Sequence, residues 1–118
     1  MRPATSSSIF SSTVTLLTGL TVMMFVLARF SGYEAMLDYA GGFIPARVQQ
    51  PDLLAHSGLT IPAMPVWLTP LSSTLLHGGW IHLGFNMLML LFCGRQVEQV
   101  LGARPMWPLY VVVAYAAA

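Results

Sequence analysis

The charged residues of this chain divide it into three long neutral stretches. Residues 3–28, 53–94 and 105–118 contain no Asp, Glu, Lys or Arg. A helix needs about 20 apolar residues to cross the hydrocarbon core of a bilayer, and two of the stretches exceed that length. Charged residues make up only 8% of the 118 residues, against about 25% in a typical soluble domain. The pattern predicts an all-α membrane protein.

The composition also argues against several other classes of protein. The five positive charges are all arginine and are spread along the chain, so no clustered basic face for nucleic acid is expected. Hydrophobic residues make up 56% of the chain, whereas disordered segments are poor in them. The lone Cys93 excludes an internal disulfide and a CxxC-type zinc or redox site. We therefore expect the lipid bilayer as a partner, and no cofactor.

The first predicted membrane span covers residues 9–28 and ends at Arg29, with residues 1–8 as a cytoplasmic N-terminus. A cleaved signal peptide is the alternative, because Arg2 precedes the apolar run and small residues follow it. The run is long for a signal peptide, and no clear A-x-A cleavage site follows. A retained span is the favoured interpretation.

Two further spans are predicted in the second half of the chain. Residues 75–94 contain no proline and end at Gly94 and Arg95, where glycine and charge are expected to stop the helix. Residues 106–118 form a shorter apolar run that as a helix reaches only about 20 Å. Because a helix ending inside the bilayer would leave carbonyls unpaired, we expect the chain to be the front piece of a longer protein.

Residues 29–74 form the predicted outer loop between the first two spans. Pro51, Pro62, Pro65 and Pro70 interrupt regular helix there. The loop is too apolar for a solvated linker, so we expect it in the membrane interface, with Tyr39 and Trp67 at headgroup level. With two retained spans, Arg2, Arg95 and Arg104 lie on the same side of the membrane, against two arginines in the outer loop. The positive-inside rule therefore favours a cytoplasmic N-terminus.

Polar side chains inside the second span are the candidates for chemistry, because such residues are costly in a membrane. His82 and Asn86 are four residues apart and share one helical face. An imidazole N–H and an amide NH₂ aimed at one point could stabilise the oxyanion of an acyl transfer. From the residues alone, the alternative that they hydrogen-bond to neighbouring helices and hold the bundle together is favoured.

The other reactive side chains have simpler interpretations. His77 is expected at the start of the helix in a structural role, and haem or metal ligation by the histidines is a minor alternative, with no HExxH motif present. Ser73 is expected in a helix cap or turn, and Cys93 is expected to be buried and inert. Glu98 is expected to form a surface ion pair with Arg95 or to cap a helix.

The segment from residue 77 to residue 102, HGGWIHLGFNMLMLLFCGRQVEQVLG, resembles the second transmembrane helix and following loop of the rhomboid intramembrane serine proteases. The likeness rests on the His-x4-His-x3-Asn series and on the G-x-x-V-E pattern that ends at Glu98. The stretch GFIPA and the lead-in WLTPLSSTLLH are also similar to bacterial members. Where the family often has a Trp-Arg pair in the first loop, Leu68 follows Trp67.

The resemblance implies the front portion of a six-helix bundle in a bacterial inner membrane. It implies that His82 and Asn86 help form the oxyanion hole and that His77 is structural. The family's nucleophile is the Ser of a GxSG motif opening the fourth span, and its base is a His on the sixth, and neither motif occurs in these 118 residues. The expected function is cleavage of transmembrane or juxtamembrane segments of membrane proteins, with this piece inactive alone. The alternatives are a proteolytically inactive relative that binds membrane clients, and a small haem-binding scaffold.

Overall fold

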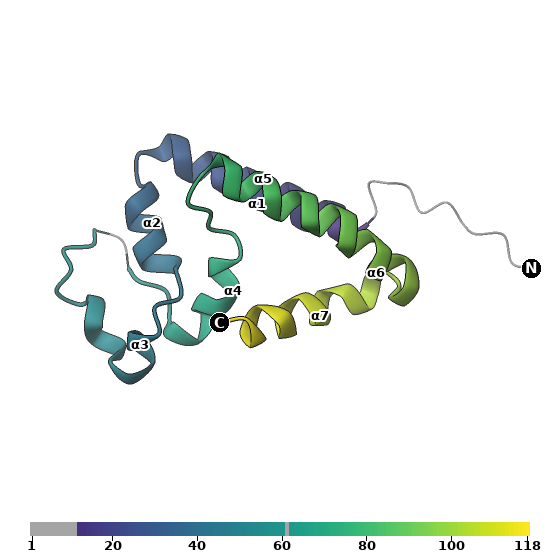
Figure 1. Ribbon diagram of the computed structural model, residues 1–118. Helices are drawn as coiled ribbons and strands as arrows, with labels where there is room; N and C mark the ends of the chain where they lie inside the picture. The colour runs from purple at the N-terminus through teal and green to yellow at the C-terminus, as the bar shows by residue number, and fades with distance from the viewer. Residues whose placement is uncertain (1–11, 61) are drawn as a thin grey trace, which may run out of the picture.

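The computed structural model describes residues 12–60 and 62–118, and this part of the chain is helical without strands. Two long helical runs lie side by side, and a third helix and a group of short helices complete a triangular frame (Figure 1). The short helices lie between the two long runs in the sequence. The all-α class expected from the sequence is therefore confirmed.

The first long helix, α1 (Thr13–Ser31), is predominantly apolar, carries its one charge at Arg29 in the last turn, and contains no proline. Its 19 residues have a mean hydropathy of 1.7 in the 18-residue window tested, so it is long and apolar enough to cross a membrane. The expected end at Arg29 is wrong, because the helix continues to Ser31 and stops where Gly32 adopts φ 78°. Glycine tolerates this left-handed conformation without a Cβ clash. The expected start at residue 9 lies outside the described residues.

The second long run joins α5 (Trp80–Met89), the π-helical segment η4 (Leu90–Gly94) and α6 (Arg95–Leu101). Its 22 residues extend about 33 Å, enough to cross a bilayer by length. The run begins at Trp80, and residues 75–79, which were expected to be its first residues, precede it. The expected end at Gly94 and Arg95 is also wrong. Gly94 keeps right-handed helical dihedrals, so the backbone continues to Gly102, where φ is 86°.

The last helix, α7 (Ala103–Ala116), follows the second run directly after Gly102. It starts three residues before the expected 106 and includes Pro108 in its interior. Pro105 falls in the first turn, where the missing N–H of proline has no helical partner to lose. The helix packs against α1 and α4 and returns along the frame (Figure 1).

The segment between the long runs, expected to be an irregular outer loop over residues 29–74, contains several short helices. They are α2 (Glu34–Gly41), α3 (Ala46–Gln49), the 3-10 turns η2 (Pro51–Leu54) and η3 (Val66–Leu68), and α4 (Thr69–Ser73). Two of its prolines lie in the first turn of an element, Pro51 at the first position of η2 and Pro70 at the second position of α4, where proline is tolerated.

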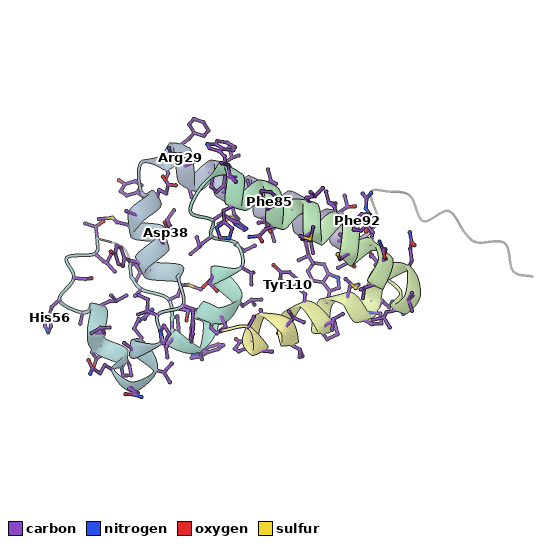
Figure 2. All side chains as sticks on the ribbon, viewed as in Figure 1. Arg29, Asp38, His56, Phe85, Phe92 and Tyr110 are labelled. Carbon is purple, nitrogen blue, oxygen red and sulfur yellow. The ribbon has the colours of Figure 1, made fainter. Side chains whose placement is uncertain are left out.

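Helix α1 is the centre of the packing, because it contacts α2, η4, α6 and α7. Val14, Leu17 and Phe25 on α1 are buried, and the Phe25 ring meets Trp80 edge to face at 4.9 Å between centroids. Most other large apolar side chains stand exposed along the helices (Figure 2). An apolar surface of this extent is typical of a protein that meets lipid or further helices.

Candidate functional site

The candidate residues lie on α5, whose first residue, Trp80, meets Phe25 of α1 and whose continuation η4 packs against α1. Leu83 is the buried residue of α5, and farther along the run Gly94 meets Val14. A Cβ placed on Gly94 would come within 3.1 Å of Val14 Cγ2, so the absence of a side chain there permits this close approach. This packing fixes the rotation of the run about its own axis. It therefore fixes which face α5 turns away from α1.

His82 and Asn86 lie on a part of α5 that this packing leaves uncovered. Both are exposed, and they are four residues apart, so their side chains project from neighbouring turns of the same face. Within the described residues, neither side chain forms a hydrogen bond. The favoured alternative of helix–helix hydrogen bonds finds no partner for them in the part of the chain that the structure describes.

His77 lies in the irregular segment before α5 and is buried, with 6% of its surface exposed. Its ring centroid is 5.1 Å from that of His82, with the two planes tilted by 57°. Its Nδ1 is buried and has no hydrogen-bond partner among the described residues. His77 is therefore a packing neighbour of His82, and it precedes the start of the helix, where it was expected to lie.

Glu98 on α6 caps the N-terminus of α1. Its carboxylate accepts the backbone N–H of Thr13 at 2.6 Å and that of Val14 at 3.3 Å, and it also accepts the Ser12 hydroxyl. Negative charge at this end of a helix satisfies free N–H groups and complements the helix dipole. Of the two roles expected for Glu98, the helix cap is the correct one. The ion pair with Arg95 does not form, and the Arg95 guanidinium instead lies 3.4 Å from the Thr15 hydroxyl.

The part of the chain that carries these residues matches the family model of the Rhomboid domain over residues 65–118. This part of the chain belongs to the rhomboid family. No curated protein and no solved structure matches the chain. The match includes α4, α5, η4, α6 and α7, so His77, His82, Asn86 and Glu98 all lie within the rhomboid segment.

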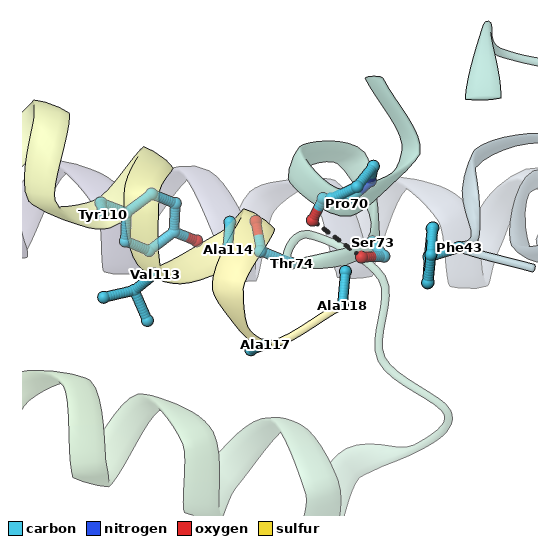
Figure 3. Close-up of a pocket in the computed structure, with 9 residues that line it drawn as sticks. All are labelled: Phe43, Pro70, Ser73, Thr74, Tyr110, Val113, Ala114, Ala117 and Ala118. Atoms are coloured by element: carbon cyan, nitrogen blue, oxygen red, sulfur yellow. Dashed lines mark hydrogen bonds between the residues drawn. The ribbon is translucent and has the colours of Figure 1, made fainter. Parts of the chain in front are cut away.

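Ser73, also in the rhomboid segment, faces a pocket of about 430 Å³ between α4 and α7 (Figure 3). The lining residues are Phe43, Pro70, Ser73, Thr74, Tyr110, Val113, Ala114, Ala117 and Ala118. The Ser73 hydroxyl donates to the Pro70 carbonyl at 2.9 Å, which places it in the turn role expected for it. No histidine, acid or other base lines this pocket, so its residues do not form a hydrolytic site.

The remaining reactive groups of the rhomboid segment are the thiol of Cys93 and the potential metal ligands. Cys93 was expected to be buried, and it is exposed on η4. Over residues 12–60 and 62–118, no group of three or more potential ligands gathers to hold a metal ion. A residue that sequence reasoning missed is Arg47, which precedes the rhomboid segment and is buried on α3. Its neighbours in the sequence give no sign of that burial.

Proposed function

We propose that this chain supplies the oxyanion-stabilising helix of an intramembrane serine endopeptidase. The observation that carries the proposal is the placement of His82 and Asn86 on one uncovered face of α5, within residues that belong to the rhomboid family. Two hydrogen-bond donors with no partner inside the described chain are free to bind a charge that develops in a reaction. The family match supports the reaction class.

In the proposed reaction a serine from a segment outside these 118 residues attacks the scissile carbonyl, while a histidine base accepts its proton. The carbonyl oxygen becomes an oxyanion, which the imidazole N–H of His82 and the amide of Asn86 stabilise. Collapse of this intermediate expels the amine and leaves an acyl-enzyme, which water then hydrolyses. In this proposal the residues of this chain stabilise the oxyanion. They neither attack the scissile carbonyl nor accept the proton of the serine.

The position of His77 supports the role given to His82. The two rings are 5.1 Å apart, and His77 is buried while His82 is exposed. A buried neighbour restricts the rotamers of the ring above it, and restricted donors are what an oxyanion hole requires. We propose His77 as a positioning residue and His82 and Asn86 as the donors.

The proposed substrates are transmembrane or juxtamembrane segments of membrane proteins, and the proposed location is a bacterial inner membrane. The large exposed apolar surface of α1, α5 and α7 supports a bilayer environment. The proposed spans are α1, the run from α5 into the start of α6, and α7 continued by further chain. The N-terminus, the rest of α6 with Glu98 and the turn at Gly102 would then lie on the cytoplasmic side.

The test uses the protein together with the segment that carries the nucleophile, reconstituted in liposomes with a fluorogenic transmembrane peptide. Asn86→Ala should lower kcat about 10²–10³-fold, with KM changed much less. Leu88→Ala is the matched control, because Leu88 is an exposed residue of the same helix without a polar group. Unchanged kcat in a folded Asn86→Ala protein would refute the role of Asn86. Peptide binding without cleavage by the unmodified protein would favour the inactive, client-binding alternative.

A further inference from the structure

Arg47 is a buried arginine in the segment between the two long helical runs. It lies on α3 with 4% of its surface exposed. Its Nη2 donates to the carbonyl oxygen of Met64 at 2.8 Å, which ties α3 to the chain just before η3. The guanidinium therefore lies inside the outer segment, where an arginine side chain is rarely found without a partner.

The other two nitrogens of this guanidinium have no partner among residues 12–60 and 62–118. Nε and Nη1 of Arg47 are buried, and neither forms a hydrogen bond with the described residues. A guanidinium stays protonated in proteins, so its charge cannot be removed by a pKa shift. A buried charge and its unpaired N–H groups are costly unless an opposite charge compensates them. The described residues therefore leave the charge of Arg47 uncompensated.

A pocket of about 380 Å³ lies against Arg47, within the usual range for sites of small ligands. Its lining includes the apolar side chains of Leu54 and Leu59 and a single acidic residue, Asp52. Asp52 is exposed and forms no ion pair with Arg47. The pocket therefore combines a buried positive charge with an apolar wall.

We propose that this Arg47 pocket binds a phosphate oxyanion. Guanidinium groups bind phosphate through paired, charge-assisted hydrogen bonds, and Nε and Nη1 are the donors with capacity to spare. The apolar wall surrounds the glycerol and acyl portion of a phospholipid more favourably than water does. A lipid headgroup is therefore the expected source of the phosphate. Because both nitrogens are covered, binding requires the pocket wall to move aside.

The experiment measures the Tm of the full chain in a neutral detergent during titration with three probes. Phosphatidylglycerol should raise Tm by at least about 5 °C near saturation, and diacylglycerol with the same acyl chains should have no effect. Inorganic phosphate is the third probe. A response to inorganic phosphate equal to that of the lipid would assign the site to free phosphate. Absence of any response to both phosphate sources would overturn the proposal.

Three variants identify the site. Arg47→Gln should abolish the response, whereas Arg104→Gln, which changes an exposed arginine remote in sequence from the pocket, should retain it. Equal loss in both would show non-specific attraction and overturn the proposal. Asp52→Asn removes the one carboxylate of the pocket and should lower the half-saturating phosphate concentration about 3–10-fold. If Arg47→Gln does not fold, an unchanged half-saturation in Asp52→Asn overturns the proposal instead.

Discussion

The Glu98 carboxylate accepts the backbone N–H of Thr13 at 2.6 Å, joining residues that are 85 positions apart in the sequence. The contact places an acidic side chain of α6 at the first turn of α1, next to the N-cap Ser12. Most helix caps come from the adjacent residue, whereas this one depends on the tertiary arrangement of two long helical runs. Its strength is therefore a measure of how firmly those runs are held together.

Replacing Glu98 should loosen that junction. Glu98→Ala removes the acceptor of two backbone N–H groups and one hydroxyl, so the free energy of unfolding should fall by about 1–3 kcal/mol. Denaturant unfolding in micelles measures the change. Glu34→Gln is the control, because it breaks an exposed ion pair with Arg29 and should cost less than about 1 kcal/mol. An equal loss of unfolding free energy in the two variants would show that the Glu98 cap stabilises the protein no more than an exposed ion pair does.

The same cap predicts a dependence of stability on pH. Burial raises the pKa of Glu98, but hydrogen bonds from Ser12, Thr13 and Val14 outweigh burial and hold that pKa below its ordinary value. The stabilisation is therefore complete above the unfolded pKa of about 4.3 and is lost as the pH falls through the lower folded pKa.

Asp38 acts in the opposite sense and must be removed to isolate the effect of Glu98. Burial, and then the charge of Glu34, raise the pKa of Asp38, so its ionisation lowers stability as the pH increases through that range. Unfolding midpoints between pH 3 and 7, measured in an Asp38→Asn background, should fall at the acid end. Adding Glu98→Gln should flatten that fall. An unchanged pH profile would show that Glu98 does not cause the loss of stability at low pH.

Close packing at Gly94 predicts a steric penalty that a second mutation relieves. A Cβ at Gly94 already lies 3.1 Å from Val14 Cγ2, and Val14 is fully buried. Gly94→Leu should therefore destabilise the protein by about 1–3 kcal/mol, and Val14→Ala in the same chain should recover part of that loss. A double-mutant cycle measures the coupling.

Gly84 provides the matched control for this cycle. It lies on α5 with no atom within 4 Å of an added Cβ. Gly84→Ala should leave stability unchanged or raise it by up to about 1 kcal/mol, through helix propensity. A zero coupling energy between Gly94→Leu and Val14→Ala would show that the two residues do not pack as described.

The proposed membrane orientation can be tested by cysteine labelling in intact cells. In a Cys93→Ser background, Ser57→Cys lies in the outer segment and Gln99→Cys lies near the turn at Gly102; both positions are exposed. A membrane-impermeant maleimide should label position 57 from outside and position 99 only after permeabilisation. The reverse pattern would refute the orientation, whereas labelling of both from outside would refute the crossing between them.

The sequence predicts the helices well and their ends poorly, for an identifiable reason. Long neutral runs locate apolar helices, because hydropathy sums over many residues. Charge at Arg29 and glycine at Gly94 are typical of helix ends by residue type alone, yet Arg29 lies in the last turn of α1 and Gly94 adopts helical dihedrals against Val14. The residues that do end helices, Gly32 and Gly102, have positive φ, which depends on local geometry.

The candidate site shows the same division between local and tertiary information. The spacing of His82 and Asn86 is enough to predict that they share one face of a helix, because four residues make about one turn. The burial of Arg47 and the target of Glu98 cannot be predicted in this way. Both contacts join distant segments, Arg47 with Met64 and Glu98 with Thr13.

The distance in sequence between Thr13 and Glu98 also bears on how the protein is made. During synthesis the first turn of α1 emerges from the ribosome long before the carboxylate that satisfies its amides. At about 5–20 residues per second, the 85 intervening positions correspond to roughly 4–17 seconds of translation. Throughout that interval water, lipid headgroups or the insertion machinery must occupy those N–H groups, so the amino end of the first helix is completed only when the second has been inserted.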